Sequence, residues 1–252
     1  MRYVLKIAYD GTDYAGWQYQ PNAPSIQEAL ENAIFQALGQ RIKTTASGRT
    51  DAGVHAAGQV CHFDGEGITV PPEKMPDCLN RFLPADIRAL EGWGADNSFD
   101  SNRSAKRKTY CYSLYESRRE NPLKERFSTR VENIPSIEAL RRVAKLFEGE
   151  HDFKGFCASG SSVKTTVRTV YEVRVEENES LGSRDIKIYV TGNGFLYNMV
   201  RTMVGTLLDV ASGKREEESF LSVYQTGDRS LLGKTMSAKG LTLLQVGYQN
   251  NE

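Results

Sequence analysis

The segment SGRTDAGVHA at 47–56 places Arg49, Asp51 and a histidine within ten residues of glycine- and alanine-rich chain. Gly48 and Gly53 flank the arginine and the aspartate closely. Glycine reaches backbone angles that other residues avoid, so we expect Asp51 at a sharp loop tip. Its carboxylate, with a reference pKa of about 3.9, is ionised at neutral pH and can act as a nucleophile or base. The alternative is a turn aspartate that hydrogen-bonds to its own backbone.

Two further side chains could take part in such chemistry. The segment RKTYCY at 107–112 places Tyr110 and Tyr112 on one face of a strand, where tyrosines ordinarily pack in a core. Tyr110 is a candidate site residue only if it lies beside a catalytic group. Arg201 falls at the border of the apolar stripe of a helix expected over 199–208. Its guanidinium can extend to solvent from there, or turn inward to pair with a carboxylate.

Basic residues concentrate between Arg103 and Arg130, although the whole chain has 32 basic and 32 acidic side chains. This stretch contains nine Lys and Arg residues and only three glutamates. Four aromatic residues are interleaved with these charges, namely Tyr110, Tyr112, Tyr115 and Phe127. Arg and Lys contact nucleic-acid phosphates, and aromatic rings stack on bases. The stretch fits an RNA-contacting region, or equally a solvated loop with core tyrosines.

Cysteine and histidine usage gives no sign of a metal centre. The four cysteines, at 61, 78, 111 and 157, and the three histidines lack the spacing of zinc ligands. Scattered thiols are typical of a reducing cytosol. The N-terminal residues lack a signal-peptide pattern, and no apolar run is long enough to span a bilayer. We expect a cytoplasmic protein with no membrane association.

The elements that must position these residues follow one order twice. The first half predicts strands at 3–9, 41–47, 56–63 and 86–93, with helices at 25–38 and 71–82. The second predicts strands at 107–115, 166–175, 185–190 and 241–248, a polar turn at 176–183, helices at 137–147 and 199–208, and an acidic extra helix near 215–226.

Both halves therefore have the β-α-β-β-α-β order of ferredoxin-like units. We place the joint in the polar residues 96–104, between an N-terminal half at 1–100 that carries the Asp51 loop and a C-terminal half at 101–252 that carries the basic, aromatic region. The fold class is α+β. Two such units side by side predict a continuous mixed, mainly antiparallel sheet with helices on one face and a central cleft at the seam.

The segment GRTDAGVHA resembles the signature of the tRNA pseudouridine synthase A family. Further segments agree in order: YDGTDYAGWQ at 9–18, RKTYCY at 107–112, GNGFLYNMVRTMVG at 192–205 and GLTLLQVGY at 240–248. The resemblance covers almost the whole chain. It implies the pseudouridine synthase fold and isomerisation of uridine to pseudouridine at positions 38, 39 and 40 of the tRNA anticodon arm. It also implies no cofactor, no metal, and a homodimer whose subunits both touch the tRNA.

By motif position, the resemblance implies that Asp51 is the nucleophile and that Tyr110 contacts the target base. It implies that Arg49 enters the RNA stack as that base flips out, and that Arg201 pairs with the catalytic carboxylate. Attack of Asp51 on the ribose C1′ and attack on the base are both compatible with the sequence. One departure is visible, because Ser237-Ala238 stands where the family often has a proline pair.

Two other functions compete with this one. A non-catalytic RNA-binding module of two ferredoxin-like units explains the basic stretch but leaves the loop around Asp51 without a purpose. A hydrolase of glycosidic bonds usually needs two carboxylates, and this loop offers one.

Overall fold

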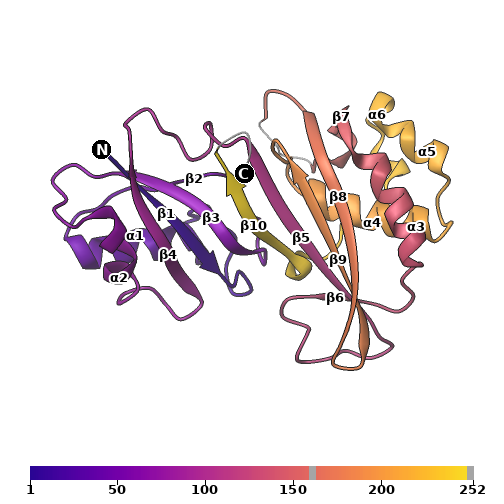
Figure 1. Cartoon of the computed structure of the whole chain (residues 1–252), viewed down its shortest axis with the longest axis horizontal. Coiled ribbons are helices and arrows are strands. Elements are labelled where there is room, and N and C mark those ends of the chain that lie inside the picture. The colour runs from indigo at the N-terminus through magenta and orange to yellow at the C-terminus, as the bar shows by residue number, and fades with distance from the viewer. Residues whose placement is uncertain (159–162, 249–252) are drawn as a thin grey trace. The chain divides into compact units, whose positions relative to one another are not determined.

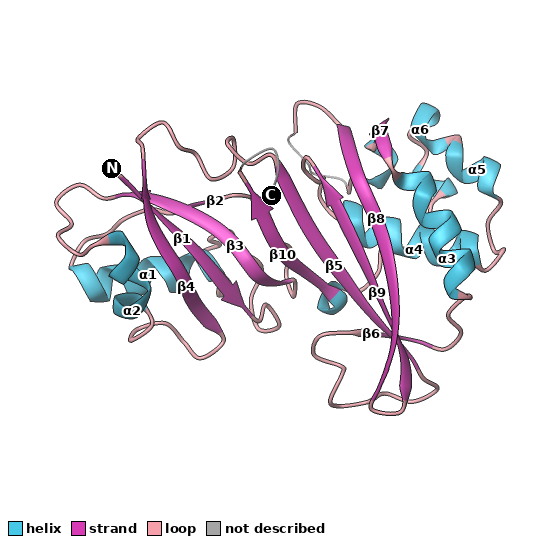
Figure 2. Ribbon diagram, in the orientation of Figure 1, coloured by secondary structure: helices cyan, strands magenta, loops and turns pink. Residues whose placement is uncertain are grey.

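The computed structural model describes residues 1–158 and 163–248, and the chain forms two compact units (Figure 1). Unit 1 comprises Met1–Lys106 together with the chain from Thr242 onward, and unit 2 comprises Arg107–Leu241. Each unit combines a sheet with helices, as Figure 2 shows, so the α+β class is confirmed. The two units are described in turn.

The elements of unit 1 follow the predicted β-α-β-β-α-β order. They are β1 (Arg2–Tyr9), α1 (Ile26–Leu38), β2 (Thr45–Ala46), β3 (His55–Asp64), a 3-10 turn (Pro72–Lys74), α2 (Met75–Leu79) and β4 (Ile87–Ala95). The last strand of the chain, β10 (Leu241–Gly247), pairs with β3 as well. β1 lies between β4 and β3 and is antiparallel to both, whereas β10 is parallel to β3.

The outer edge of β3 is shared by two short pairings. β2 pairs with the end of β3 at Cys61 and His62, whereas β10 pairs with its beginning at His55 and Ala56. The chain that enters β3 therefore leaves the sheet as a loop after β2. This arrangement positions residues 47–54, which carry the aspartate of interest.

The strand predicted at 41–47 is wrong in length, because only Thr45–Ala46 pairs. Side chains of α1 instead form hydrogen bonds with the backbone N–H and carbonyl of Thr44. Glu31 accepts the Thr44 N–H at 2.8 Å, and Gln27 donates to the Thr44 carbonyl at 3.1 Å. A backbone bound on both sides by a helix has no groups left for a sheet ladder.

The helix predicted at 71–82 is also too long. Pro76 has no N–H to continue the 3-10 turn that precedes it, and it suits the first turn of a new helix, α2. α2 ends at Asn80, whose side-chain amide bonds both backbone groups of Ala89 in β4. The amide therefore fixes the end of the helix to the sheet.

The core of unit 1 lies between its sheet and α1. Alternate residues of β1, namely Tyr3, Leu5, Ile7 and Tyr9, are all buried, as the period-two pattern predicts. α1 begins where the Ser25 hydroxyl accepts the Glu28 N–H at 3.2 Å, and it buries Ile26, Leu30, Ala33 and Ile34. The helix expected at 25–38 is confirmed, with Ser25 as its N-terminal cap.

The strands of unit 2 are hydrogen-bonded in the order β6-β5-β9-β8-β7. Its elements are β5 (Arg107–Glu116), β6 (Thr129–Val131), α3 (Ile137–Ala144), β7 (Gly149–Asp152), β8 (Val167–Ser180), β9 (Ser183–Gly192), α4 (Met199–Ala211), α5 (Glu217–Leu221) and α6 (Val223–Thr226). Neighbouring strands are antiparallel except β5 and β6. The short strands β6 and β7 were not predicted.

Two predictions in unit 2 need correction. The polar residues 176–183 belong largely to β8 and β9, and the turn between these strands is only Leu181-Gly182, both with positive φ. The acidic helix near 215–226 divides into α5 and α6 at Ser222, which caps both. By contrast, α4 buries Met199, Val200, Met203, Val204 and Leu207 as its stripe predicts.

Candidate functional site

Residues 47–54, which we name the Asp51 loop, connect β2 to β3. The chain turns back at Asp51, whose carbonyl accepts the Val54 N–H at 3.1 Å. Gly53 has a φ of 76°, a conformation that favours glycine, so the predicted sharp turn is confirmed. The Arg49 side chain is exposed and Asp51 is half-buried. An aspartate carboxylate on such a loop can attack an electrophilic carbon or accept a proton.

The chain after β1 braces this loop through backbone contacts. In this segment, residues 10–17, the Trp17 N–H donates to the Thr50 carbonyl at 3.1 Å. Gly16 has a φ of 96°, and a Cβ at this position would lie only 2.4 Å from the Thr50 carbonyl oxygen. Glycine is therefore required for the two backbones to come this close. The motifs at 9–18 and 48–56 form one structure, which the sequence alone did not reveal.

A second brace acts on the other side of the turn. The Gly53 N–H donates to the Tyr14 carbonyl at 3.2 Å, and the Tyr14 hydroxyl donates to Asp86 at 2.9 Å. Burial and the Asp86 carboxylate raise the pKa of Tyr14, so the hydroxyl stays protonated. The loop is therefore linked to the chain that leads into β4.

His55, the histidine of the motif, is buried at the start of β3. Its Nδ1 lies 3.0 Å from the Gly11 backbone nitrogen, which donates to it, and 3.1 Å from Asp10 Oδ1. His55 therefore connects Asp10 and Gly11, at the start of the segment 10–17, to β3. These contacts give it a structural role next to the loop.

Sequence reasoning missed four buried polar residues around the loop, namely Tyr9, Ser47, Thr50 and Gln59. The alternation of residues 3–9 predicts Tyr9 only as one member of an apolar strand face. The available signal was Gln59, an amide within the mostly apolar strand AAGQVCHF. A buried amide must find hydrogen-bond partners, so its position near the loop could have been suspected.

Tyr110 lies on β5 in unit 2 with 8% of its surface exposed. Its ring packs edge-to-face on Phe195, with centroids 5.3 Å apart and an angle of 89° between the ring planes. Lys108, two residues earlier, points to the same face of the strand. Burial, with Arg168 adding to it, lowers the pKa of Lys108 to about 8.

Arg201 lies on the first turn of α4 and is half-buried. Its Nε donates to the Met236 carbonyl at 2.7 Å, and its Nη1 donates to Asn198 Oδ1 at 2.7 Å. The Met236 N–H in turn donates to the Arg201 carbonyl at 3.2 Å. Side chain and backbone are thus both bound to the chain that leads into the last strand.

The four predicted site residues therefore divide between the units. Arg49 and Asp51 share one loop of unit 1, whereas Tyr110 and Arg201 belong to unit 2. The pairing of Arg201 with the Asp51 carboxylate stays a prediction.

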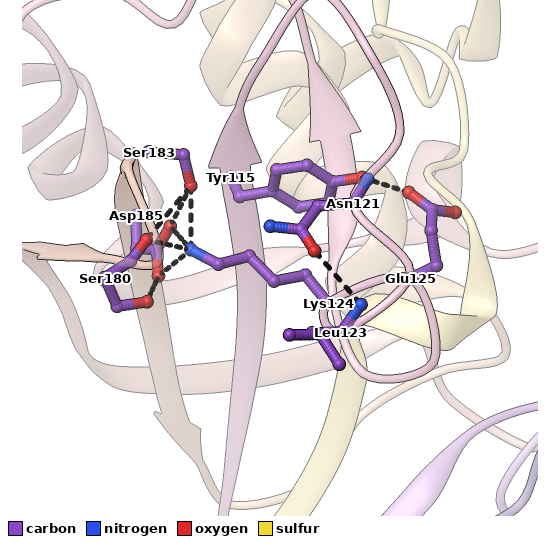
Figure 3. Close-up of polar contacts among 8 residues, drawn as sticks. All are labelled: Tyr115, Asn121, Leu123, Lys124, Glu125, Ser180, Ser183 and Asp185. Carbon is purple, nitrogen blue, oxygen red and sulfur yellow. Dashed lines mark hydrogen bonds and ion pairs between the residues drawn. The ribbon is translucent and has the colours of Figure 1, made fainter.

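The basic stretch of unit 2 contains an internal anchor (Figure 3). Lys124 is 7% exposed, and its Nζ lies 2.5 and 2.7 Å from the two Asp185 oxygens. It also donates to the Ser180 carbonyl and the Ser183 hydroxyl, both at 2.7 Å. Burial alone would raise the pKa of Asp185, but the hydrogen bonds from Lys124, Ser180 and Ser183 outweigh it and lower the pKa.

Residues 117–128, which we name the basic segment, are bound to β5 by a second group of contacts. Tyr115 donates its hydroxyl to Glu125 and accepts the Asn121 N–H at 3.1 Å. Glu125 is also paired with Lys239. Lys124 and Tyr115 are therefore structural, whereas Arg118 and Arg119 are exposed. Fewer cations of this segment are exposed than its charge count indicates.

Among the described residues, no group of three or more His, Cys, Asp and Glu side chains could hold a metal ion. Within residues 1–158 and 163–248, no helix has both the length and the apolar character needed to cross a membrane.

The chain is similar to known proteins over most of its length. A family described as tRNA pseudouridine synthase matches residues 6–95 and 143–249. The tRNA pseudouridine synthase A of Thermoanaerobacter sp. (strain X514) is 39% identical over 245 residues, which are 97% of this chain and 98% of that protein. The protein of the same name from Syntrophotalea carbinolica is 42% identical over 249 residues, covering 97% of this chain and 95% of that one. Among solved structures, a chain from a crystal structure of a Cbf5-Nop10-Gar1 complex matches with a TM-score of 0.38 and 15% identity, covering 98% of this chain and 60% of that chain.

Proposed function

The chain belongs to the tRNA pseudouridine synthase family, and on that premise we propose that it isomerises uridine at positions 38, 39 and 40 of the tRNA anticodon stem-loop. The enzyme class is isomerase. The reaction breaks the bond between uracil N1 and ribose C1′, rotates the base and joins C5 to C1′. The C5 proton is lost and N1 gains a proton, so atoms and charge balance without an oxidant, a reductant or a cofactor.

Asp51 is the nucleophile in this proposal. The observation that carries it is the bracing of one carboxylate-bearing loop from both sides, through Thr50 and Gly53. Attack on the ribose C1′ and attack on the uracil ring both require an ionised carboxylate held in a fixed position. A hydrolase would need a second carboxylate acting with Asp51 to activate water.

Arg49 assists the extrusion of the target base. A base inside a stem leaves the stack at a cost of a few kcal/mol, and a planar guanidinium can occupy the gap. Arg49 supports this role because its side chain is exposed while the backbone on either side of it is bound. A rigid backbone with a free side chain suits insertion between bases.

Tyr110 and Arg201 complete the site from unit 2. Tyr110 stacks on the detached uracil and prevents its loss, for which the edge-to-face contact with Phe195 supplies a fixed ring plane. Arg201 pairs with the Asp51 carboxylate and keeps it ionised when the bound RNA excludes water. Its hydrogen bonds to Met236 and Asn198 restrict the guanidinium to a small range of positions.

The basic segment contacts the tRNA backbone through Arg118 and Arg119 in this proposal, because exposed guanidinium groups bind phosphate. We further propose that the enzyme acts as a homodimer whose subunits both touch one tRNA. We place the reaction in the cytoplasm, where the cysteines, free in the structure, stay reduced.

Mapping pseudouridine in tRNA tests the proposal. Unmodified tRNA is incubated with the enzyme, and pseudouridine is located along the whole molecule. We expect the modification at positions 38, 39 and 40 wherever a uridine stands there, and loss of each signal when that uridine is replaced by cytidine. Modification elsewhere, with an unchanged anticodon arm, would contradict the proposed site. Release of free uracil would support the hydrolase instead.

A further inference from the structure

We propose that Gln59 is a positioning residue for the Asp51 loop, acting through a buried chain of amide and hydroxyl groups that fixes the backbone on both sides of Arg49. This inference rests on the proposed function, because its purpose is to hold Arg49 and Asp51 for their reaction steps. It adds the device that holds them.

The amide of Gln59 is wholly buried and fully used. Its Oε1 accepts from the Ser47 hydroxyl at 2.7 Å, and its Nε2 donates to the Gly48 carbonyl at 2.8 Å and toward the Tyr9 hydroxyl at 3.5 Å. A carbonyl can only accept, so the NH₂ group must face Gly48. The orientation of the whole amide follows from that one contact.

The chain continues through Tyr9 to Thr50. The two hydroxyl oxygens are 2.8 Å apart, and both side chains are buried. Each hydroxyl carries one proton and either oxygen can donate in this contact, so the tyrosine proton is one of the two that can form the bond. Burial raises the pKa of Tyr9 to about 12, so this proton is present throughout the physiological range.

The consequence concerns the residues between the two anchors. The Gln59 amide binds the Gly48 carbonyl, and Tyr9 contacts the Thr50 side chain, whose residue is also bound through its carbonyl by the Trp17 N–H. The backbone on both sides of Arg49 is therefore held, while the Arg49 side chain is exposed. Asp51 follows directly. A displacement of about 1 Å in a reacting group can cost roughly 100-fold in rate, which makes such a network part of the machinery. Its members act in concert, since removing one leaves a buried partner unsatisfied.

Two pairs of variants test the network. Gln59→Leu removes all three contacts, whereas Gln59→Glu keeps the shape and turns an oxygen toward the Gly48 carbonyl. Thr50→Val removes the hydroxyl at similar shape, and Thr50→Ser retains it. We expect kcat to fall about 10- to 100-fold in both Gln59 variants and about 3- to 10-fold in Thr50→Val. KM for anticodon-arm RNA should stay within about twofold, and Thr50→Ser should recover most of the rate.

Tyr3 offers a matched control on the same strand face. Its hydroxyl is buried and donates to the Val70 carbonyl at 2.6 Å, so Tyr3→Phe removes a comparable hydrogen bond. We expect Tyr3→Phe and Tyr9→Phe to lower Tm alike. Only Tyr9→Phe should lower kcat, because only its hydroxyl reaches the Asp51 loop.

The deciding experiment combines single-turnover rates with amide hydrogen exchange of residues 47–54. Faster exchange and a lower rate in Gln59→Leu, with neither in Tyr3→Phe, would support the inference. Wild-type exchange and wild-type rate in Gln59→Leu would overturn it. Asp51→Ala, measured in parallel, tests the nucleophile separately: an active Asp51→Ala enzyme would refute that assignment, while the exchange data would still decide the role of Gln59.

Discussion

The Asp51 loop of unit 1 and the basic segment of unit 2 are attached to their sheets by different means. The Asp51 loop is bound at several points by neutral groups, namely the backbone of residues 10–17 and the amide and hydroxyls around Gln59. The basic segment is anchored mainly by the ion pair between the buried Lys124 and the half-buried Asp185, with a hydrogen-bonded group at Tyr115. Both attachments leave arginine side chains exposed.

The difference fits the two proposed tasks. A reacting carboxylate and an intercalating arginine must be placed to within a fraction of an ångström, and many short bonds restrict a backbone in all directions. An RNA-backbone contact tolerates more freedom, because phosphates are numerous and electrostatic attraction has long range. Changes in the Asp51 loop should therefore alter kcat, and changes in the basic segment should alter KM.

Arg49→Ala is expected to lower kcat far more than it changes tRNA affinity, and this difference should be the largest among the variants. The proposed insertion occurs after docking, so kcat should fall about 100-fold while tRNA affinity changes by less than about threefold. Rates on two hairpins that differ only in whether the target uridine is paired provide the measurement. The paired target should suffer more. Equal losses on both hairpins would contradict a role in base extrusion.

Replacing Arg118 and Arg119 together by alanine should have the opposite effect. We expect KM to rise roughly tenfold at moderate salt with kcat retained, and the salt dependence of binding to weaken by about one to two phosphate contacts. Titration of tRNA binding between low and moderate salt measures both. An unchanged salt slope would remove these arginines from the RNA interface.

Lys124→Met should lower stability and, to a smaller extent, raise KM. Loss of the buried cation leaves Asp185 unpaired, which we expect to cost about 2 kcal/mol of unfolding free energy at neutral pH. The pKa of Asp185 is lowered in the folded state, so the pair contributes fully above the unfolded pKa of about 3.9 and its contribution is lost as pH falls through the folded value.

Denaturant unfolding of both proteins from pH 7 to pH 3 checks this prediction. The stability difference between wild type and Lys124→Met should shrink below about pH 4. Gln59→Leu provides the contrast, since its partners are neutral and its stability deficit should not change over that range. A Lys124→Met deficit that stays constant with pH would contradict the ion-pair account.

The sequence pattern predicted those features of the structure that depend on residues close together in the chain. The start of a helix at Ser25, the stripe of α4 and the sharp turn at Gly53 depend on neighbours a few residues away, and each is confirmed. The element order of unit 1 followed from these signals and from strand periodicity, whereas the short strands β6 and β7 of unit 2 were not predicted.

The failures have long-range causes. Thr44 leaves the predicted strand because Glu31 of α1 takes its N–H, and Lys124 is buried because Asp185 lies beside it in space. Tyr9 belongs to an apolar strand pattern, and that pattern does not indicate that its hydroxyl contacts Thr50, which is 41 residues away in the sequence. Tertiary contacts determine such partners, and the spacing of apolar residues along the sequence contains no information about them.

The most direct test of the proposed chemistry compares wild type with Asp51→Asn, which keeps the shape of the side chain and removes its charge. Pseudouridine in the anticodon arm and the Kd for tRNA are measured on the same preparations. We predict no detectable pseudouridine and a Kd within about threefold of wild type, because the carboxylate acts only after binding. Pseudouridine formed by Asp51→Asn at the wild-type rate would contradict the account.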